Sequence, residues 1–374
     1  MRIAIISTSF PESSDGSEAA GGFVRDFAQE LATQDAVWVV APGACESESV
    51  EGGLHIVRFR APRLPLSLLS PVNPGHWPAI VITLWNGWAA ARTLSRAIEI
   101  DHVLAFWALP SGFWARATGT NFSVWCLGSD IWVLSKVPVV KSYLRHVLRQ
   151  SQLLFADGIA LANDATRISS RECRFLPSSR RLPVKLPARP LAISEKYVVG
   201  FLGRWHPNKG IDLLMEALQS LSDSQWRCIS RVEIAGGGPL ESTVMAATRA
   251  LQDAGRPIIV KGFLDSAAAA TFLDTIDILV IPSRIESIPV IFSDAMQAGR
   301  PVISTPVGDL PALVKRYNVG RLAENATAAA LAKALGKNEL DAAIHCAVNC
   351  AQAALDFDVV TAVRDFKSSI SATA

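Results

Sequence analysis

The sequence predicts an α/β protein made of two doubly wound domains in series, each a parallel β-sheet with helices on both faces. Short apolar runs such as RIAIIST (2–8) and AVWVVAP (36–42) alternate with helical patterns along the chain. Continuous apolar strands of this kind are typical of parallel sheets buried on both faces. The alternation begins again after a Pro/Arg-rich stretch at 180–196, where three prolines within eight residues favour a linker.

The first half contains four clear strand signals and two helix signals. We expect strands at 2–8, 36–42, 102–107 and 122–127. In the helix FVRDFAQELA, Phe23, Phe27 and Leu31 share one face, as a period of 3.6 residues requires. The apolar run Ala79 to Ala91 is shorter than the roughly 18 residues that a membrane-spanning helix needs, so we expect a buried or interfacial helix there.

The second half repeats the pattern. We expect a helix over 209–221 and strands at 197–203, 231–238, 257–263, 277–283 and 301–305. Another helix should begin with Ser287 as N-cap and Pro289 in its first turn, and end before Gly299 as the C′ residue. Ligands bind such sheets at the carboxyl ends of the strands, so a site should lie in the cleft between the two domains.

Composition excludes several classes of protein. Six cysteines in 374 residues do not make a disulfide framework, and neither Cys346 and Cys350 nor the six histidines show metal-ligand spacing, so we expect no metal. The amino terminus lacks a signal-peptide cleavage site, because Pro11, Glu12 and Asp15 follow its short apolar run, and we expect a cytoplasmic protein. A net charge of +2 argues against nucleic acid as a partner.

Positive charge is concentrated in one stretch. Residues 131–189 hold eleven Lys or Arg and three acids, a balance of +8 that leaves the rest of the chain at about −6. Lys141, Arg145 and Arg149 recur every four residues and should line one helix face. Such a face is a solvated surface, or it contacts an anionic membrane or a phosphorylated acceptor. Tryptophans are frequent in the first half of the chain, and either belong to the core or line a sugar- or lipid-binding groove; they include Trp77, Trp85, Trp88, Trp107, Trp114, Trp125 and Trp132.

Three constellations in the second half carry chemistry. In GRWHPNKGIDLL, Gly203 ends a strand, Arg204 and Lys209 follow in the loop and a helix opens, which together favour an anion site or else an ordinary charged loop. The glycines of IAGGGPLE make a turn that does not match a P-loop. In PSRIESIPVIFSDAM, Glu286 and Asp294 are too far apart to share a proton, so we expect two separate acceptors along one extended polar ligand.

These motifs, followed by VKGFLD and PVISTPVGDLP, resemble family 4 glycosyltransferases of the GT-B fold in order and spacing. The resemblance is specific over the second domain and weaker over the first, where GGFVRDFAQELA is similar to the family's glycine loop and WCLGSDIW to its His-Gly-Ser-Asp segment. It implies two Rossmann-like domains facing across a cleft. We expect an acceptor-binding domain at 1–188, a donor-binding domain at 189–355, and a carboxy-terminal helix at 356–374 crossing back to the first domain.

The resemblance implies a retaining, metal-independent transfer from a nucleotide-diphosphate sugar to a glycan or lipid-linked acceptor, with no other cofactor. Arg204 and Lys209 would hold the diphosphate and stabilise its charge as it leaves, and Glu286 would hold hydroxyls of the donor sugar. Asp294 would bind the ribose. The remaining donor-site residues implied are Gly21, Gly22, Gly203, Gly237, Phe263, Leu264, Ser287, Ile288 and Val290, and the acceptor-site candidates are Leu127, Gly128, Ser129 and Asp130.

Three departures from the family pattern leave alternatives open. Asp294 stands where the family has Glu, Leu127 where it has His, and VGDLPAL where it has Gly-Gly-Ile-Pro-Glu. The leading hypothesis is an active hexosyltransferase-type enzyme in the cytoplasm, either free or bound peripherally to the inner face of the membrane. The alternatives are another GT-B activity, such as an epimerase or a phosphorylase, and a catalytically weak nucleotide-sugar-binding partner subunit. The base and sugar of the donor and the linkage are not specified by the sequence.

Overall fold

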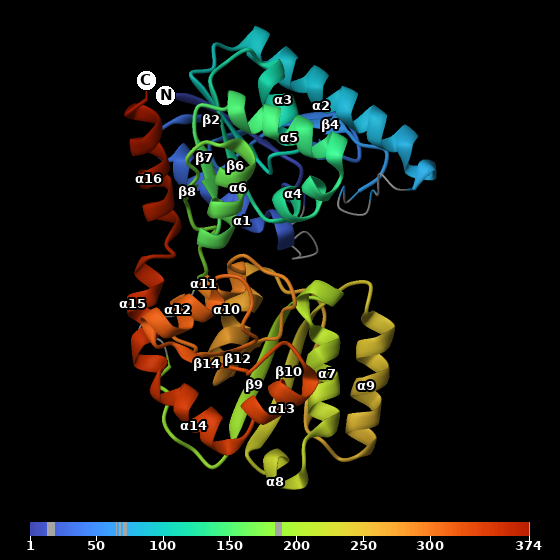
Figure 1. Ribbon diagram of the computed structural model, residues 1–374, viewed down its shortest axis with the longest axis vertical. Helices are drawn as coiled ribbons and strands as arrows, with labels where there is room; N and C mark the ends of the chain where they lie inside the picture. The colour runs from blue at the N-terminus through green and yellow to red at the C-terminus, as the bar shows by residue number, and fades with distance from the viewer. Residues whose placement is uncertain (13–18, 65, 67–68, 70–72, 184–188, 374) are drawn as a thin grey trace. The chain divides into compact units, whose positions relative to one another are not determined.

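The computed structural model describes residues 1–12, 19–64, 66, 69, 73–183 and 189–373, and the chain divides into two compact units (Figure 1). Unit 1 holds the described residues up to Arg180 and those from Val359 onward; unit 2 holds those between Arg181 and Asp358. The boundaries expected after 188 and 355 differ by a few residues. Leu182 and Phe357 explain the difference, because both are buried in a core cluster of unit 2.

The core of unit 1 is an eight-stranded sheet in the order β3-β4-β2-β1-β5-β6-β7-β8. Every neighbouring pair is parallel except β3 and β4. The chain moves outward from β1 to β2 and later returns to β5 on the other side of β1, so the order reverses between β1 and β5. The strands are β1 Arg2–Ser7, β2 Ala36–Gly43, β3 Ser47–Glu51, β4 Leu54–Arg60, β5 His102–Phe106, β6 Phe122–Cys126, β7 Leu154–Ala156 and β8 Arg174–Phe175.

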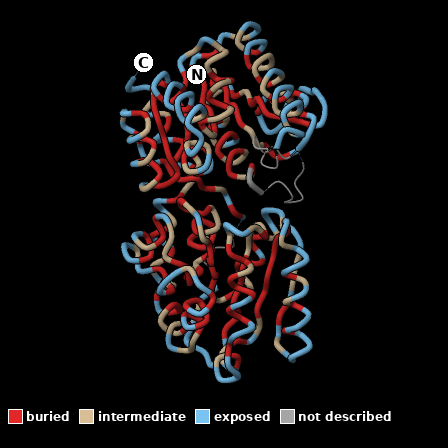
Figure 2. The backbone as a smooth tube through the Cα atoms, turned by 45° about the vertical axis from the view of Figure 1, so that its right-hand side comes forward, coloured by how far each residue is buried: buried red, intermediate tan, exposed pale blue. Residues whose placement is uncertain are grey.

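Helices cover both faces of this sheet, and the central strands between them are buried (Figure 2). Side chains alternate between the faces, as a strand period of two requires. Ala105 and Val124 pack in one cluster with Trp114 and Leu144, whereas Phe106 and Trp125 contact Phe27 on the other face. The longer helices are α1 Ala19–Ala32, α2 Trp77–Ala97, α3 Ser111–Ala117, α5 Pro138–Gln150, α6 Ile159–Ser169 and α16 Val359–Ser371, and the short ones are η2 Pro74–His76, α4 Ser129–Trp132 and η3 Leu134–Lys136.

The last helix, α16, belongs to unit 1 although the chain enters it from unit 2. Phe366 is fully buried, and its ring lies 5.8 Å from those of Phe27 and Phe155 and 6.0 Å from that of His102. Burial lowers the pKa of His102 to about 4, so its ring is neutral at pH 7. Lys367 pairs with Asp35 at 2.6 Å, which adds a charge contact beside the aromatic one.

Unit 2 is a second doubly wound sheet with the strand order β11-β10-β9-β12-β13-β14, all parallel. Its order reverses between β9 and β12. The strands are β9 Tyr197–Arg204, β10 Ile229–Gly237, β11 Ile258–Lys261, β12 Ile278–Ile281, β13 Val302–Ser304 and β14 Gly320–Leu322. The helices are η4 Pro207–Lys209, α7 Ile211–Ser220, α8 Asp223–Trp226, α9 Glu241–Asp253, α10 Ser266–Thr275, α11 Val290–Gln297, α12 Leu310–Tyr317, α13 Ala328–Ala334, α14 Lys337–His345, η5 Ala347–Asn349 and α15 Cys350–Leu355.

One helical run, Lys337–Ser371, is long and apolar enough by composition to cross a membrane. The structure breaks this run into α14, η5, α15 and α16. Leu340 and Ile344 of α14, Cys350 of α15 and Phe366 of α16 are all buried within the protein. Packing within the two units therefore accounts for part of the apolar character of the run, of whose most apolar window 39% is buried.

The helix expected at 79–91 extends from Trp77 to Ala97, and only one side of it is buried. Thr83, Gly87, Ala91 and Leu94 face the protein. Gly87 is required by this packing, because a Cβ there would lie 2.4 Å from the indole ring of Trp114. The tryptophans divide accordingly, since Trp114 and Trp125 are core residues and Trp85 is 65% exposed.

Because Phe366 fills the space between α16, α1 and the sheet, Phe366→Ala should destabilise unit 1 by about 3–5 kcal/mol. Hydrogen exchange measured segment by segment should show lost protection in α1 and β5, with β9 and β12 of unit 2 unchanged. Val360→Ala on the same helix is the control, because Val360 is 44% exposed. Equal loss of protection in both units would contradict the assignment of α16 to unit 1.

Candidate donor-binding site

The predicted donor-site residues of unit 2 lie at the carboxyl ends of β9, β10, β11 and β12, and the strand order reverses between β9 and β12. Arg204 is the last residue of β9, and Lys209 follows in η4. Glu286 lies in the loop between β12 and α11. The reversal of strand order leaves a crevice at this edge in open α/β sheets, and ligands bind there.

The loop after β9 is held by backbone contacts. Trp205 N–H donates to the carbonyl of Gly237 at 2.8 Å, and Arg284 N–H donates to that of Asn208 at 2.8 Å. Gly210 has φ 68°, and a Cβ on it would lie 1.8 Å from the carbonyl oxygen of Pro282. Only glycine permits this approach, which brings η4 directly against the loop that carries Glu286.

Arg204 and Lys209 bring two positive charges to this edge. The Arg204 side chain is half-buried and has no hydrogen-bond or carboxylate partner among the described residues. The pKa of His206, in the same loop, is lowered mainly by burial and further by the positive charges of Arg204 and Lys209. The His206 ring is therefore neutral at pH 7, and its Nδ1 accepts from Asn208 N–H at 3.2 Å. A half-buried guanidinium without a counter-ion favours the binding of an anion.

Glu286 is ion-paired to Lys209 through its Oε1 atom. The same oxygen accepts a hydrogen bond from Ser283 Oγ at 3.3 Å. The Glu286 side chain is 11% exposed, so its second oxygen has little contact with water. A carboxylate held in this way presents acceptor capacity to a ligand that displaces or shares Lys209.

Arg284 and Asp212 were not anticipated from the sequence. Arg284 donates to both oxygens of Asp212, at 2.7 and 2.9 Å, and so fastens the Glu286 loop to α7. Burial alone would raise the pKa of Asp212, but the hydrogen bonds and charge of Arg284 outweigh it and lower that pKa. The signal available in the sequence was an acid in the first turn of a helix, which by itself is common.

The helix after Glu286 begins later than expected. α11 starts at Val290 with Pro289 as N-cap, not at Ser287, because proline supplies no N–H and its fixed φ suits the residue entering a helix. Pro289 makes no side-chain cap, which leaves N–H groups of the first turn for other partners. The expected C′ residue is confirmed, since Gly299 has φ 68° directly after Ala298.

Asp294 lies in the second turn of α11 and is fully buried, at 0% exposure. Ser287 and Ile288 are each 5% exposed, and Ile288 packs in the core below them. The backbone of Ile288, rather than its side chain, is thus what a ligand could contact. The carboxylate of Asp294 can contact a ligand only if the surface above it opens or if the ligand reaches below the surface.

The residues expected near the base lie at the ends of β10 and β11. A Cβ on Gly237 would lie 2.7 Å from the ring of Phe263, so glycine allows that ring to lie flat over the turn. Phe263 is 44% exposed, and Leu264 packs against the core. Gly203 has room for a side chain, but a Cβ on its neighbour Gly236 would lie 2.0 Å from the Gly203 carbonyl. An exposed aromatic face beside a glycine turn suits a planar base.

In unit 1, Leu127, Gly128, Ser129 and Asp130 follow β6, and Gly128 has φ 102°. Asp130 is buried and accepts from the N–H groups of Ala108 at 2.7 Å, Ile131 at 3.1 Å and Leu127 at 3.2 Å. Its burial outweighs these bonds and raises its pKa. Asp130 therefore ties the end of β6 to the end of β5, which is a structural task that the family motif does not reveal by itself.

Gly21 and Gly22 were expected in a loop, and the structure instead places them in the first turn of α1. A Cβ on Gly21 would lie 2.8 Å from Pro11 Cδ, whereas nothing lies within 4 Å of one on Gly22. Gly21 is thus needed for the close packing of the chain after β1. At Gly22, the backbone near the amino end of the helix is not covered by other atoms on the side where a Cβ would point.

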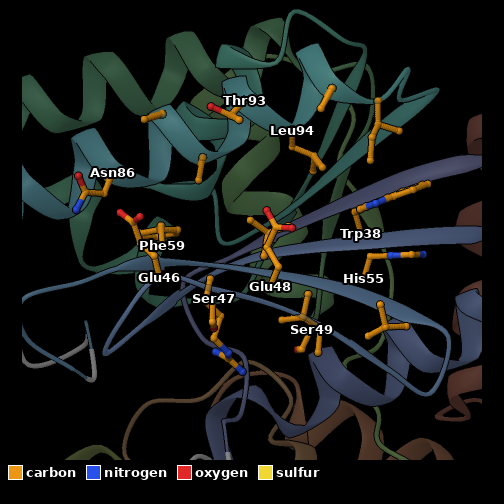
Figure 3. Close-up of a pocket in the computed structure, with 18 residues that line it drawn as sticks. Trp38, Glu46, Ser47, Glu48, Ser49, His55, Phe59, Asn86, Thr93 and Leu94 are labelled. Atoms are coloured by element: carbon orange, nitrogen blue, oxygen red, sulfur yellow. The ribbon is translucent and has the colours of Figure 1, made fainter.

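An open groove in unit 1 lies apart from all of these residues (Figure 3). Trp38 and His55 stack in it at 5.1 Å, and Glu48 points toward α2 from the edge strand. The groove lies between α2 and the strands β2, β3 and β4. It contains none of the residues predicted from the sequence.

Among the residues that the structure describes, no three His, Cys, Asp or Glu side chains gather in a way that could hold a metal ion. The six cysteines are all free. Cys346 and Cys350 are buried, and burial raises the pKa of Cys350 to about 12, so that its thiol stays protonated.

Comparisons with known proteins agree with this architecture. Residues 196–338 match the family described as Glycosyl transferases group 1. The putative colanic acid biosynthesis glycosyltransferase WcaL of Escherichia coli is 32% identical over 170 residues, which is 43% of this chain and 38% of WcaL. The chain spans between 37% and 64% of the length of the first three curated relatives.

Solved structures resemble the whole chain. Sucrose-phosphate synthase from Thermosynechococcus elongatus matches all of both chains with a TM-score of 0.76 at 17% identity. HepE of Anabaena, solved in complex with UDP-glucose, also matches all of both chains, with a TM-score of 0.69 at 15% identity. Such low identities establish the fold alone. The similarity to the glycosyl transferases group 1 family is confined to residues 196–338, and the fold of the chain is that of the GT-B glycosyltransferases.

Proposed function

We propose that this protein is a glycosyltransferase that moves a sugar from a nucleotide-diphosphate sugar to a glycan or lipid-linked acceptor, with retention and without a metal. One observation carries the proposal. Arg204, which has no partner among the described residues, and Lys209 lie at the carboxyl end of β9, beside Glu286, within a group 1 glycosyltransferase domain.

The two cations suit a diphosphate. Arg204 offers a planar fork and Lys209 a compact charge, and together they stabilise the negative charge that grows as the nucleotide diphosphate leaves. Because Lys209 is paired with Glu286 before any donor arrives, the diphosphate competes with that carboxylate for the ammonium group. Glu286 is then available to accept hydrogen bonds from the donor sugar.

The other proposed donor contacts run along the ligand from the sugar and phosphate to the ribose and the base. The N–H groups near Ser287, Ile288 and Val290 meet sugar and phosphate at the uncapped end of α11. Asp294 accepts from the ribose hydroxyls, and Phe263 and Leu264 lie against the base. In unit 1, the backbone at Gly21 and Gly22 contacts the donor phosphate and the acceptor, and the turn at 127–130 contacts the acceptor.

The acceptor class is supported only by relatives and by chemistry. The WcaL relative is described as acting in colanic acid biosynthesis, and HepE was solved with UDP-glucose, so a UDP-sugar and a glycan acceptor are reasonable for this chain. Six free cysteines suit a reducing compartment, which supports a cytoplasmic location.

A catalytically weak nucleotide-sugar-binding subunit is the second candidate. It is favoured by the complete burial of Asp294 and by Leu127 in place of the family's histidine. Incubating the purified protein with UDP-, GDP- and ADP-sugars separates the two. Slow hydrolysis of one donor supports an enzyme, and nucleotide binding with no turnover, alone or with lipid acceptors, supports the subunit.

Arg204→Ala and Lys209→Ala should each remove most of the thermal stabilisation that UDP, GDP or ADP gives the wild type. A charge-assisted hydrogen bond is worth about 1.5–3 kcal/mol, so affinity should fall roughly 10- to 150-fold. A thermal-shift titration with the three nucleotides measures this and identifies the base. Lys333→Ala is the control, since that side chain is 81% exposed. Wild-type shifts in both site variants would refute the assignment.

Asp294→Glu should be tolerated or should raise nucleotide affinity, because glutamate keeps both acceptor oxygens and restores the longer side chain of the family pattern. Isothermal titration with the preferred nucleotide tests this, and the corresponding nucleotide without a 2′-hydroxyl serves as control ligand. A fall in both affinity and melting temperature would mean that the core cannot accept the methylene, at a cost of about 1–3 kcal/mol. The pocket would then be adapted to aspartate.

A further inference from the structure

The outward face of α2 is apolar over its first two turns. Val81 is 63% exposed, Ile82 45% and Trp85 65%, and Trp77 on the same stripe is 56% exposed. Because residues four apart lie on one face of a helix, these side chains form a continuous stripe opposite Gly87 and Ala91, which face the protein. Contiguous exposed apolar side chains on a helix mark a contact surface.

Positive charge continues the same stripe. Arg92 and Arg96 follow Trp85 by seven and eleven residues and so project from the same side of α2. The guanidinium of Arg92 lies 5.3 Å from the ring centre of Trp88, which itself lies 5.2 Å from that of Trp85. The exposed face of α2 is therefore apolar at its amino end and basic toward its carboxyl end.

The helices beside α2 have the same charge character. α2 packs on α3, and α3 packs on α5, so the three cover one face of the sheet, with the amino-terminal ends of α2 and α5 on the same side of unit 1 (Figure 1). Their sequences contain six Lys or Arg and no acid. The three helices thus contribute only positive charges to this face, which suits a negatively charged surface.

The α5 end of this face repeats the combination of apolar and basic residues. Val137 is 48% exposed and Val139 80%, and they alternate with exposed Lys136 and Lys141. Neither lysine has a carboxylate partner among the described residues. Arg145 and Arg149 differ, because their Nε atoms donate to the carbonyls of Ile168 and Ser169 at the end of α6. The basic face expected at 141–149 is thus partly structural, and its available charge lies at the amino end.

We propose that the α2–α5 surface, defined by Val81, Ile82, Trp85, Val137 and Val139 with Lys136, Lys141, Arg92 and Arg96, docks on an anionic lipid bilayer. Aliphatic and indole side chains enter the interface between headgroups and acyl chains, while the lysines and arginines contact the lipid phosphates. Tryptophan suits this position because its ring is apolar and its N–H is polar.

The chemistry favours a bilayer over a protein partner. Protein interfaces bury a core that is depleted of charge and surrounded by residues of both signs. Here the apolar side chains project from two helices, and every charge carried by α2, α3 and α5 is positive. A surface of one sign that projects aliphatic and indole groups fits a fluid anionic layer.

Membrane docking is a property separate from the proposed sugar transfer, and it does not depend on that activity. If the proposed function holds, the surface also explains how a lipid-linked acceptor reaches the protein. Vesicle binding and nucleotide binding can be measured on the same samples, so either property can fail while the other stands.

The test is flotation of the full chain with vesicles of phosphatidylcholine alone or with phosphatidylglycerol. We expect binding only to the mixed vesicles, and weaker binding at high salt. Val81→Ser with Trp85→Ser should lower the partition coefficient about tenfold or more. Lys136→Gln with Lys141→Gln should lower it about thirtyfold, given the usual contribution of each charge near an anionic surface.

Matched controls lie in unit 2. Val348→Ser with Leu355→Ser removes side chains that are 83% and 62% exposed, and Lys315→Gln with Lys333→Gln removes two exposed charges. All four double variants should keep the wild-type nucleotide shift. No binding of wild type to mixed vesicles, or equal losses in test and control variants, would overturn the proposal. So would a wild-type oligomer that the α2 variant turns into a monomer in light scattering, because the face would then join protein chains.

Discussion

The candidate donor-binding edge of unit 2 depends on backbone segments that approach more closely than any side chain would allow. A Cβ on Gly210 would lie 1.8 Å from the Pro282 carbonyl, one on Gly236 would lie 2.0 Å from that of Gly203, and one on Gly308 would lie 2.1 Å from that of Glu286. These three contacts join the segments at the ends of β9, β10, β12 and β13. Each of the three glycines also has positive φ, so the constraint is both steric and conformational.

This interlocking explains why the charges lie where they do. The Gly210 contact brings Lys209 to the Glu286 loop, and the bidentate pair of Arg284 with Asp212 holds that loop on α7. Lys209 and Glu286 neutralise each other, while Arg204 has no carboxylate partner among the described residues. The net positive charge of the edge therefore resides mainly on Arg204, and a dianionic ligand gains most by contacting it first.

The sequence predicted the strands that carry this site, because continuous apolar runs such as 277–283 are unambiguous. It did not predict β3, β4, β7, β8 or β14. β3 is wholly exposed, exposed residues interrupt β4, and β7, β8 and β14 have three residues or fewer, so none shows a long apolar run. Gly21 and Gly22 were placed in a loop because glycine usually breaks helices, but packing against Pro11 overrides that preference. Complete burial of Asp294 could not be anticipated, because it depends on how α11 lies on the sheet rather than on its own sequence. The same limit applies to the tryptophans, because tertiary packing makes Trp114 a buried neighbour of Phe59 and leaves Trp85 exposed.

The turn at 127–130 shows how a motif can lose one residue and keep its shape. Gly128 supplies the positive φ, and the carboxylate of Asp130 gathers the N–H groups of Leu127, Ile131 and Ala108. None of these bonds uses the side chain at position 127, so replacing the family's histidine with leucine leaves the backbone geometry intact. Any effect of Leu127 must therefore come from a missing imidazole and not from a distorted turn. If the position acts through its main chain, leucine is equivalent to histidine, and the departure from the family pattern has no chemical cost.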